Sequence, residues 1–146
     1  MLEQLGSGLL SESDIGRVVH AFYTEVQKDE MLAPIFATRI SADDWESHME
    51  YIASFWSSIF LKTGRFTGNP MQKHAALEGI TPAHFQRWLA LFREVSDKVL
   101  DPAQASAMQS MAKRIAQSLQ MSLAVNYERA GQHDHPFTEF ALGLPR

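Results

Sequence analysis

The sequence predicts an all-α protein folded as one domain over residues 1–146. Along most of the chain, apolar residues recur every three or four positions, which is the period of an amphipathic helix. Residues that favour helix starts stand directly before these stripes. No segment shows the period-two alternation and β-branched enrichment typical of a strand. At 146 residues, 45% of them hydrophobic, the chain is long enough to bury a full core.

The N-terminal half contains two expected long helices. The first begins at Ser11–Asp14, which provide a capping hydroxyl and acidic charge, and it should end near Lys28. A short apolar turn follows, and Pro34 prevents it from continuing as a long helix. Ser41–Asp44 resembles a capping box with Asp in place of Glu, and it should open the second long helix, which continues through Leu61.

Three further helix starts are expected in the C-terminal half, each with proline at the first helical position. Asn69–Pro70 should start a short helix that Gly79 ends, Thr81–Pro82 a long one, and Asp101–Pro102 the last, which stops at Gly131. The fold is therefore expected to contain four long helices and one short helix.

The core is expected to extend from about residue 14 to residue 130. Residues 1–10 and 132–146 are expected to be loose ends, with Phe137 and Phe140 as possible anchors of the C-terminal tail. These boundaries follow from where the helical stripes begin and end.

Composition excludes several classes of function. Thirteen basic and 17 acidic residues give a net charge of -4, which argues against a nucleic-acid partner. Without cysteine, the chain has no disulfide, thiolate nucleophile, iron–sulfur cluster or cysteine zinc site. The apolar runs are too short for a membrane helix, and the first residues lack the pattern of a secretory signal. We therefore expect a cytoplasmic protein without a membrane partner.

Two histidines lie on apolar helix faces. His74 is in register with Met71, and His48 shares a face with Ile52. A histidine in such a position is most often packed in the core. Two on consecutive helices are unexpected, because burial disfavours the charged imidazole. Neutral imidazole is the form that ligates metals, including haem iron, so this pair indicates a metal or haem site.

Large aromatic residues could form the walls of a slot for a flat porphyrin, although aromatic stripes at helical spacing are more often plain core. The candidate wall residues are Phe36, Phe55, Trp56, Phe85 and Phe92. Tyr23 and Trp88 each place a hydrogen-bond donor on an apolar helix face. These donors either bond to backbone carbonyls or water, or they point, together with His48, at a partly negative diatomic ligand.

Other metal schemes fit less well. No Glu has a His three residues later, as a di-iron bundle requires, and no His-Glu-x-x-His is present. His133-Asp134-His135 lies in the expected loose tail and is more typical of solvated polar chain. His20 and His84 are expected to face solvent.

Read in order, these pieces resemble the group III truncated haemoglobins. The resemblance covers about residues 14–128 and rests on seven segments in the family's order: Phe22–Val26, Pro34–Phe36, Trp45 with His48, Phe55–Trp56, Gly68–Pro70 followed by His74, His84–Phe92 and Ile115–Leu119. The absence of a Gly-Gly pair also separates the chain from the other truncated groups.

The resemblance implies a globin-like fold, a two-over-two helical sandwich around one haem b. It gives His74 the position of the proximal iron ligand and Phe36 the position of the residue that packs on the haem plane. Lys73 and Arg65 are nearby cations that we expect to pair with the haem propionates.

On the distal side, the resemblance implies polar roles for Tyr23, His48 and Trp88, and it places Ile52 in the pocket wall. Trp88 is the first choice for a donor to bound ligand and Tyr23 the second. His48 either acts as a gate, moving outward when it is protonated near its unperturbed pKa of ~6.5, or binds the iron itself.

The function expected from these residues is binding of O2, and of NO or CO, at a His-ligated haem iron. An alternative is an NO dioxygenase or another haem redox enzyme, which would need an external reductase because the chain has no flavin or nicotinamide motif. A third possibility is a cofactor-free helical interaction module. The sequence leaves the physiological role and the oligomeric state open.

Overall fold

The structure is a computed structural model that describes residues 9–64 and 79–141. Within these ranges every regular element is a helix, which confirms the predicted all-α class. The helices are α1 (Glu12–Val26), α2 (Ala33–Ala37), α3 (Trp45–Phe60), α5 (Pro82–Val99) and α6 (Pro102–Arg129), with two short 3₁₀ segments, η2 (Ala42–Asp44) and η3 (Thr138–Ala141). The short helix expected after Asn69 lies outside the described residues.

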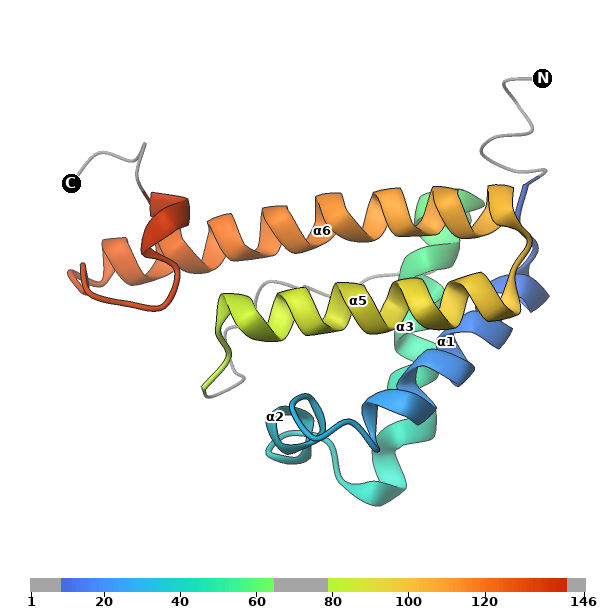
Figure 1. The fold of residues 1–146 in the computed structure, drawn as a ribbon, viewed down its shortest axis with the longest axis horizontal. Coiled ribbons are helices and arrows are strands. Elements are labelled where there is room, and N and C mark those ends of the chain that lie inside the picture. The colour runs from blue at the N-terminus through green and yellow to red at the C-terminus, as the bar shows by residue number, and fades with distance from the viewer. Residues whose placement is uncertain (1–8, 65–78, 142–146) are drawn as a thin grey trace.

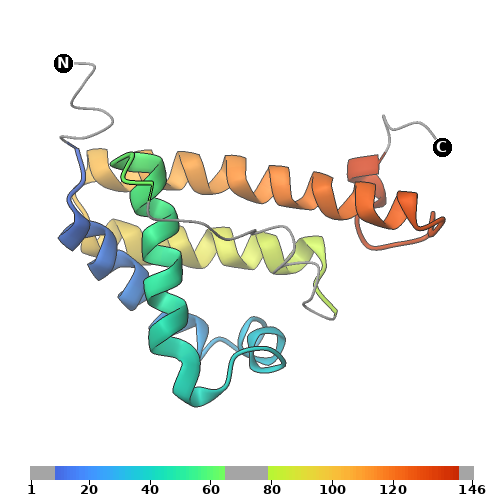
Figure 2. The same cartoon turned by 180° about the vertical axis from the view of Figure 1, so that it is seen from behind.

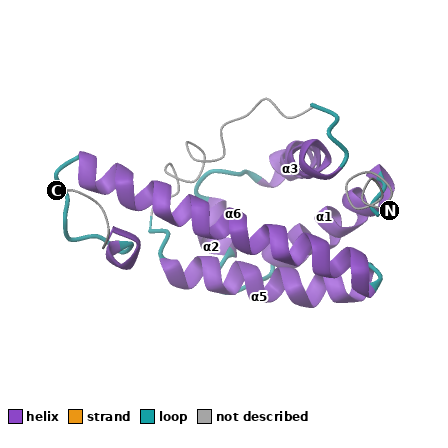
Figure 3. Cartoon of the chain, turned by 90° about the horizontal axis from the view of Figure 1, so that it is seen from above, coloured by secondary structure: helices purple, strands orange, loops and turns teal. Residues whose placement is uncertain are grey.

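The four long helices form two crossed pairs. Antiparallel α5 and α6 lie side by side. Helices α1 and α3 contact each other, and α3 crosses one face of the α5–α6 pair, behind it in Figure 1 and in front of it in Figure 2. Viewed from above, α3 stands apart from the α5–α6 pair, and α2 lies under that pair (Figure 3). This is the two-over-two sandwich that the resemblance stated above implies.

Helix starts follow the local capping signals, with one exception. At α1 the Asp14 backbone N–H donates to the Ser11 hydroxyl over 3.0 Å, and the Ser11 N–H donates to the Asp14 carboxylate over 2.9 Å. The capping box predicted at Ser41–Asp44 does not form, because the Ser41 side chain makes no hydrogen bond to the backbone of the first turn. Its hydroxyl donates to the Asp44 carboxylate over 2.8 Å, so the first turn is the 3₁₀ segment η2 and α3 begins at Trp45.

Stacked aromatic rings occupy the crossing point of the two pairs. Phe92 of α5 stacks on Trp56 of α3, with ring centroids 5.6 Å apart and an interplanar angle of 8°. Phe22 of α1 meets the same ring edge-on at 5.2 Å. Offset stacking and edge-to-face contacts are the favoured aromatic geometries, so this cluster fixes how the helices cross.

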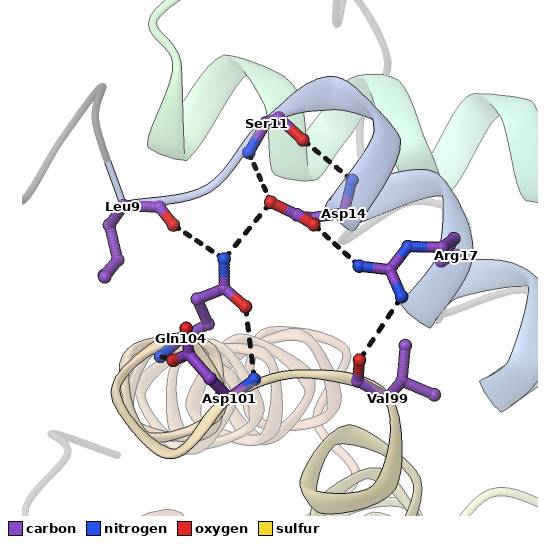
Figure 4. Close-up of polar contacts among 7 residues, drawn as sticks. All are labelled: Leu9, Ser11, Asp14, Arg17, Val99, Asp101 and Gln104. Atoms are coloured by element: carbon purple, nitrogen blue, oxygen red, sulfur yellow. Dashed lines mark hydrogen bonds and ion pairs between the residues drawn. The ribbon is translucent and has the colours of Figure 1, made fainter.

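A polar cluster joins the start of α1 to the corner between α5 and α6 (Figure 4). The Gln104 amide donates to the Leu9 carbonyl over 2.9 Å and to the Asp14 carboxylate over 3.2 Å. Arg17 pairs with Asp14 at 2.7 Å and also donates to the Val99 carbonyl. The backbone N–H of Ser11, followed by the Arg17 guanidinium, holds the pKa of Asp14 below its usual value.

The described part of the C-terminal tail was expected to be a loose end, but it folds back on the body and is anchored by Phe137, one of the two anchors that the sequence suggests. Gly131 ends α6 with φ +79°, and the chain turns back along the helix. The Phe137 side chain is fully buried and meets Phe85 at 6.0 Å. His135 accepts the Phe137 N–H at Nδ1, so its Nε2–H donates to Glu128 over 2.8 Å. At the other end, Leu10 is also buried.

None of the helices in the described ranges combines the length and the apolar character that crossing a membrane requires.

Candidate functional site

A cavity of about 550 Å³ lies between the two helix pairs, and all five α-helices described contribute to its wall. Its lining consists of Tyr23, Leu32, Ile35, Phe36, Arg39, Ile40, Ser47, His48, Tyr51, Ile52, Phe55, Trp56, Ile80, His84, Phe85, Trp88, Ile115, Ala116 and Leu119. Cofactor pockets typically measure 300–1,000 Å³ and are mostly apolar with a few placed polar groups. The size and the aliphatic and aromatic lining both fit that class.

The polar side chains of the described lining can all donate hydrogen bonds, and each of them is either neutral or positively charged. Arg39, Ser47 and His84 are among them, and no Asp or Glu occurs among the described lining residues. The cavity therefore disfavours a cationic occupant and accepts an apolar one with anionic substituents.

His48 lies among aromatic rings on the α3 side of the cavity. Its imidazole meets the rings of Tyr23 and Trp45 edge-on, both at 5.5 Å, and Phe36 lies 6.3 Å away. These contacts come from α1, α2 and α3, so three separate elements hold the imidazole at the cavity wall. His48 is therefore placed inward, as expected for a residue of the binding site.

Tyr23 and Trp88 line the same cavity and contact each other through their polar atoms. The Tyr23 side chain is only 5% exposed, and this burial raises the pKa of its hydroxyl to about 12. The Trp88 indole N–H donates a hydrogen bond to that hydroxyl, which opposes the shift in pKa but does not cancel it. Tyr23 is therefore neutral at physiological pH, and it keeps its own proton for donation to a second partner.

Most of the expected wall residues come together in this cavity. Tyr23, Phe36, His48, Ile52, Phe55, Trp56, Phe85 and Trp88 all line it. Phe92 is not among the described lining residues, and its ring stacks on Trp56 and Trp88 in the core. His74, Lys73 and Arg65 lie outside the described residues.

His84 is placed differently from the solvent-facing position expected. It is half-buried and lines the cavity, and its Nδ1 accepts the Thr81 backbone N–H over 3.0 Å. Arg39 and Ser47 also line the cavity and were not identified from the sequence. The signal available for His84 was its position three residues after Thr81, where a capping-box side chain reaches back to the backbone.

An ion pair fixes one wall of the cavity. The Asp29 carboxylate accepts two hydrogen bonds from Arg87, over 2.6 and 2.8 Å, and two more from the backbone N–H groups of Met31 and Leu32. Its side chain is only 7% exposed. Since Arg87 precedes Trp88 in α5, the pair ties the turn before α2 to the helix that carries the indole.

Asp29→Asn is expected to lower the free energy of unfolding at pH 7 by about 1–2 kcal/mol, because charge-assisted hydrogen bonds are replaced by neutral ones. The Arg87 hydrogen bonds hold the pKa of Asp29 below its usual value of 3.8. This stabilisation is therefore complete above that value and is lost as the pH falls through the lowered pKa.

Urea denaturation at pH 7 and at stepwise lower pH tests this expectation. Asp43→Asn, which removes the same charge from the exposed segment η2, is the control. Equal free energies of unfolding for the two variants at pH 7 would contradict a stabilising role for the Asp29–Arg87 pair.

Comparison with known proteins identifies the family. The model of the family described as "Bacterial-like globin" matches residues 4–121. The chain belongs to the bacterial-like globin family. It is 31% identical over 116 residues to "Group 3 truncated hemoglobin ctb" of Campylobacter jejuni, which covers 78% of this chain and 91% of that protein. This similarity places the globin with the group III truncated haemoglobins and confirms the resemblance seen in the sequence.

A solved structure agrees with the assignment of this globin. The crystal structure of group III truncated hemoglobin from Campylobacter jejuni superposes with a TM-score of 0.74, at 31% identity, and covers 78% of this chain and 91% of the other. Membership of the truncated globins implies haem-based ligand binding. The apolar cavity between the helix pairs fits such a cofactor in size and in the chemistry of its wall.

Proposed function

We propose that this globin binds haem b in the cavity, with His74 as the proximal ligand, and that it binds O2, and also NO or CO, there. The observation that carries the proposal is the cavity itself, a mostly apolar space of about 550 Å³ that the buried Tyr23 hydroxyl and its Trp88 partner line. When bound, the haem iron supplies the centre at which a diatomic gas binds reversibly.

Tyr23 is the direct donor to the diatomic ligand in this proposal. Its hydroxyl accepts from Trp88, so its own proton is directed elsewhere, and burial keeps that proton in place. Hydrogen bonds in a chain polarise one another, so the Trp88 contact makes the Tyr23 hydroxyl a stronger donor. The sequence analysis gave Trp88 as the first choice for the donor to the bound ligand and Tyr23 as the second. The hydrogen bond between them supports the opposite order, with Tyr23 as the direct donor.

His48 closes the distal side of the pocket. The edge-on contacts with Tyr23 and Trp45 hold its ring at the cavity wall, next to the Tyr23 ring. In this position the imidazole limits the entry of water, which would compete for the Tyr23 proton. The same contacts favour a closed resting position for the gate that the sequence suggests.

Trp88→Phe is expected to speed O2 dissociation by up to about tenfold, because it removes the hydrogen bond from the indole N–H to the Tyr23 hydroxyl and so makes that hydroxyl a weaker donor to O2. Stopped-flow displacement of O2 by CO measures this rate. Trp88 also stacks on Phe92, and a phenylalanine ring at position 88 largely preserves this packing. An unchanged dissociation rate would remove Trp88 from ligand stabilisation.

Titration of the reduced, haem-loaded protein with CO and with O2 tests the proposed function. We expect saturable changes in the visible spectrum with one gas molecule bound per haem. A haem-loaded protein whose spectrum does not respond to either gas would contradict gas binding while leaving haem binding intact.

A further inference from the structure

We propose that Arg39 and His84 form a carboxylate-binding rim that holds the haem propionates at the cavity mouth. The inference rests on the proposed haem binding and adds the orientation in which the cofactor enters. Neither residue was among the propionate partners expected from the sequence, Lys73 and Arg65.

The capping contact of α5 fixes the tautomer of His84. A backbone N–H can only donate, so the 3.0 Å contact from Thr81 makes His84 Nδ1 an acceptor. The Thr81 hydroxyl lies 2.9 Å from the same nitrogen. The neutral imidazole therefore carries its proton on Nε2, at the opposite side of the ring from the capping contact. His84 thus offers a donor from the part of its ring that is not engaged in the helix cap.

Arg39 supplies a permanent positive charge to the same cavity. It follows α2, and its side chain is exposed while still lining the cavity, so it lies where the cavity meets solvent. The planar guanidinium matches a carboxylate in geometry and remains charged at every physiological pH. Figure 1 shows α2 beneath the N-terminal end of α5. Arg39 follows α2 and His84 lies in the first turn of α5, so two separate elements contribute these residues to one cavity.

The distribution of polarity in the cavity selects the orientation of an amphipathic occupant. Aromatic and aliphatic residues such as Ile52, Phe55 and Ile115 form the wall, and the described lining contains no carboxylate that would repel an anion. Haem has a flat apolar body with two carboxylates on one edge. Burying the body in the apolar wall and placing that edge at Arg39 and His84 satisfies both parts at once.

The test compares haem with haem dimethyl ester, in which both carboxylates are masked. Transfer of each cofactor to an excess of a scavenging apoglobin gives its rate of loss from the holoprotein. The variants are His84→Gln and Arg39→Gln. Glutamine at position 84 can still accept the Thr81 N–H, as glutamine does in a capping box, so the helix start is kept while the Nε2–H donor is lost.

We expect His84→Gln to lose haem about tenfold faster than wild type, and Arg39→Gln about threefold faster, because exposed charges are partly screened. With the dimethyl ester, both variants should match wild type within about twofold. Arg114→Gln, which removes an exposed positive charge from α6 away from the cavity lining, should release both cofactors like wild type.

Wild-type rates of haem loss in both variants would contradict the proposed carboxylate-binding rim. If the variants lost the dimethyl ester faster than wild type by the same factor as haem, the effect would be structural, and this result would also contradict the rim. Either result leaves the proposed haem binding standing. A wild-type protein that takes up neither cofactor would instead contradict the proposed function, and the rim with it.

Discussion

His74→Gly is expected to remove the normal Soret band of the haem-loaded protein and to weaken haem retention more than any other single change. The imidazole at this position is the proposed bond between the chain and the iron, and a metal ligand of this kind contributes strongly to cofactor affinity. Glycine leaves space where the side chain was. Absorption spectra of ferric and ferrous protein at matched haem loading measure the effect.

Added imidazole provides the sharpest control for this variant. If the lost bond causes the defect, imidazole should restore a histidine-like spectrum in His74→Gly and leave the wild type unchanged. His20→Gly removes an exposed imidazole from α1 and should behave as wild type. A Soret band in His74→Gly as intense and as placed as in wild type would assign the iron ligand to another residue.

Tyr23→Phe is expected to speed O2 dissociation on the order of 10- to 100-fold. The hydroxyl is the proposed direct donor to a ligand that carries partial negative charge, and hydrogen bonds to charged groups contribute about 1.5–3 kcal/mol. Phenylalanine keeps the ring contacts with Phe22 and His48, so the pocket shape changes little. CO, which carries less charge when bound, should respond less than O2.

The double variant Tyr23→Phe/Trp88→Phe separates direct from indirect roles. If Trp88 acts through the Tyr23 hydroxyl, removing it in the Tyr23→Phe background should add little to the O2 dissociation rate. Tyr127→Phe, at a ring that stacks on His135 in the C-terminal tail, is the matched control and should leave the rate unchanged. Multiplicative effects of the two single changes would contradict the proposed chain of donors.

Local signals were sufficient to predict most of the helices. The starts at Ser11, Thr81 and Asp101 depend on side chains that reach only three residues along the chain. The start at Ser41 differs because its hydroxyl has a competing acceptor in the Asp44 carboxylate. A sequence pattern identifies both groups but does not decide which hydrogen bond forms.

The cavity wall was predictable only in part, because helical register gives the buried face and not what that face contacts. Tyr23 and Trp88, which the sequence analysis expects on the distal side of a pocket, line the cavity, while Phe92, on the same stripe as Trp88, stacks in the core. Arg39 and His84 reach the cavity through the placement of α2 beside the start of α5, which is a tertiary feature. The packed tail depends likewise on a long-range contact between Phe137 and Phe85.

The absorption spectrum of freshly purified protein, before and after dithionite, tests the central claim most directly. A haem in this cavity with histidine ligation predicts a Soret band, a shift on reduction, and a further shift with CO. A pyridine haemochrome assay on the same sample identifies the haem type. A protein that shows no visible band, and that acquires none when titrated with haemin, would contradict the account and favour a cofactor-free helical module.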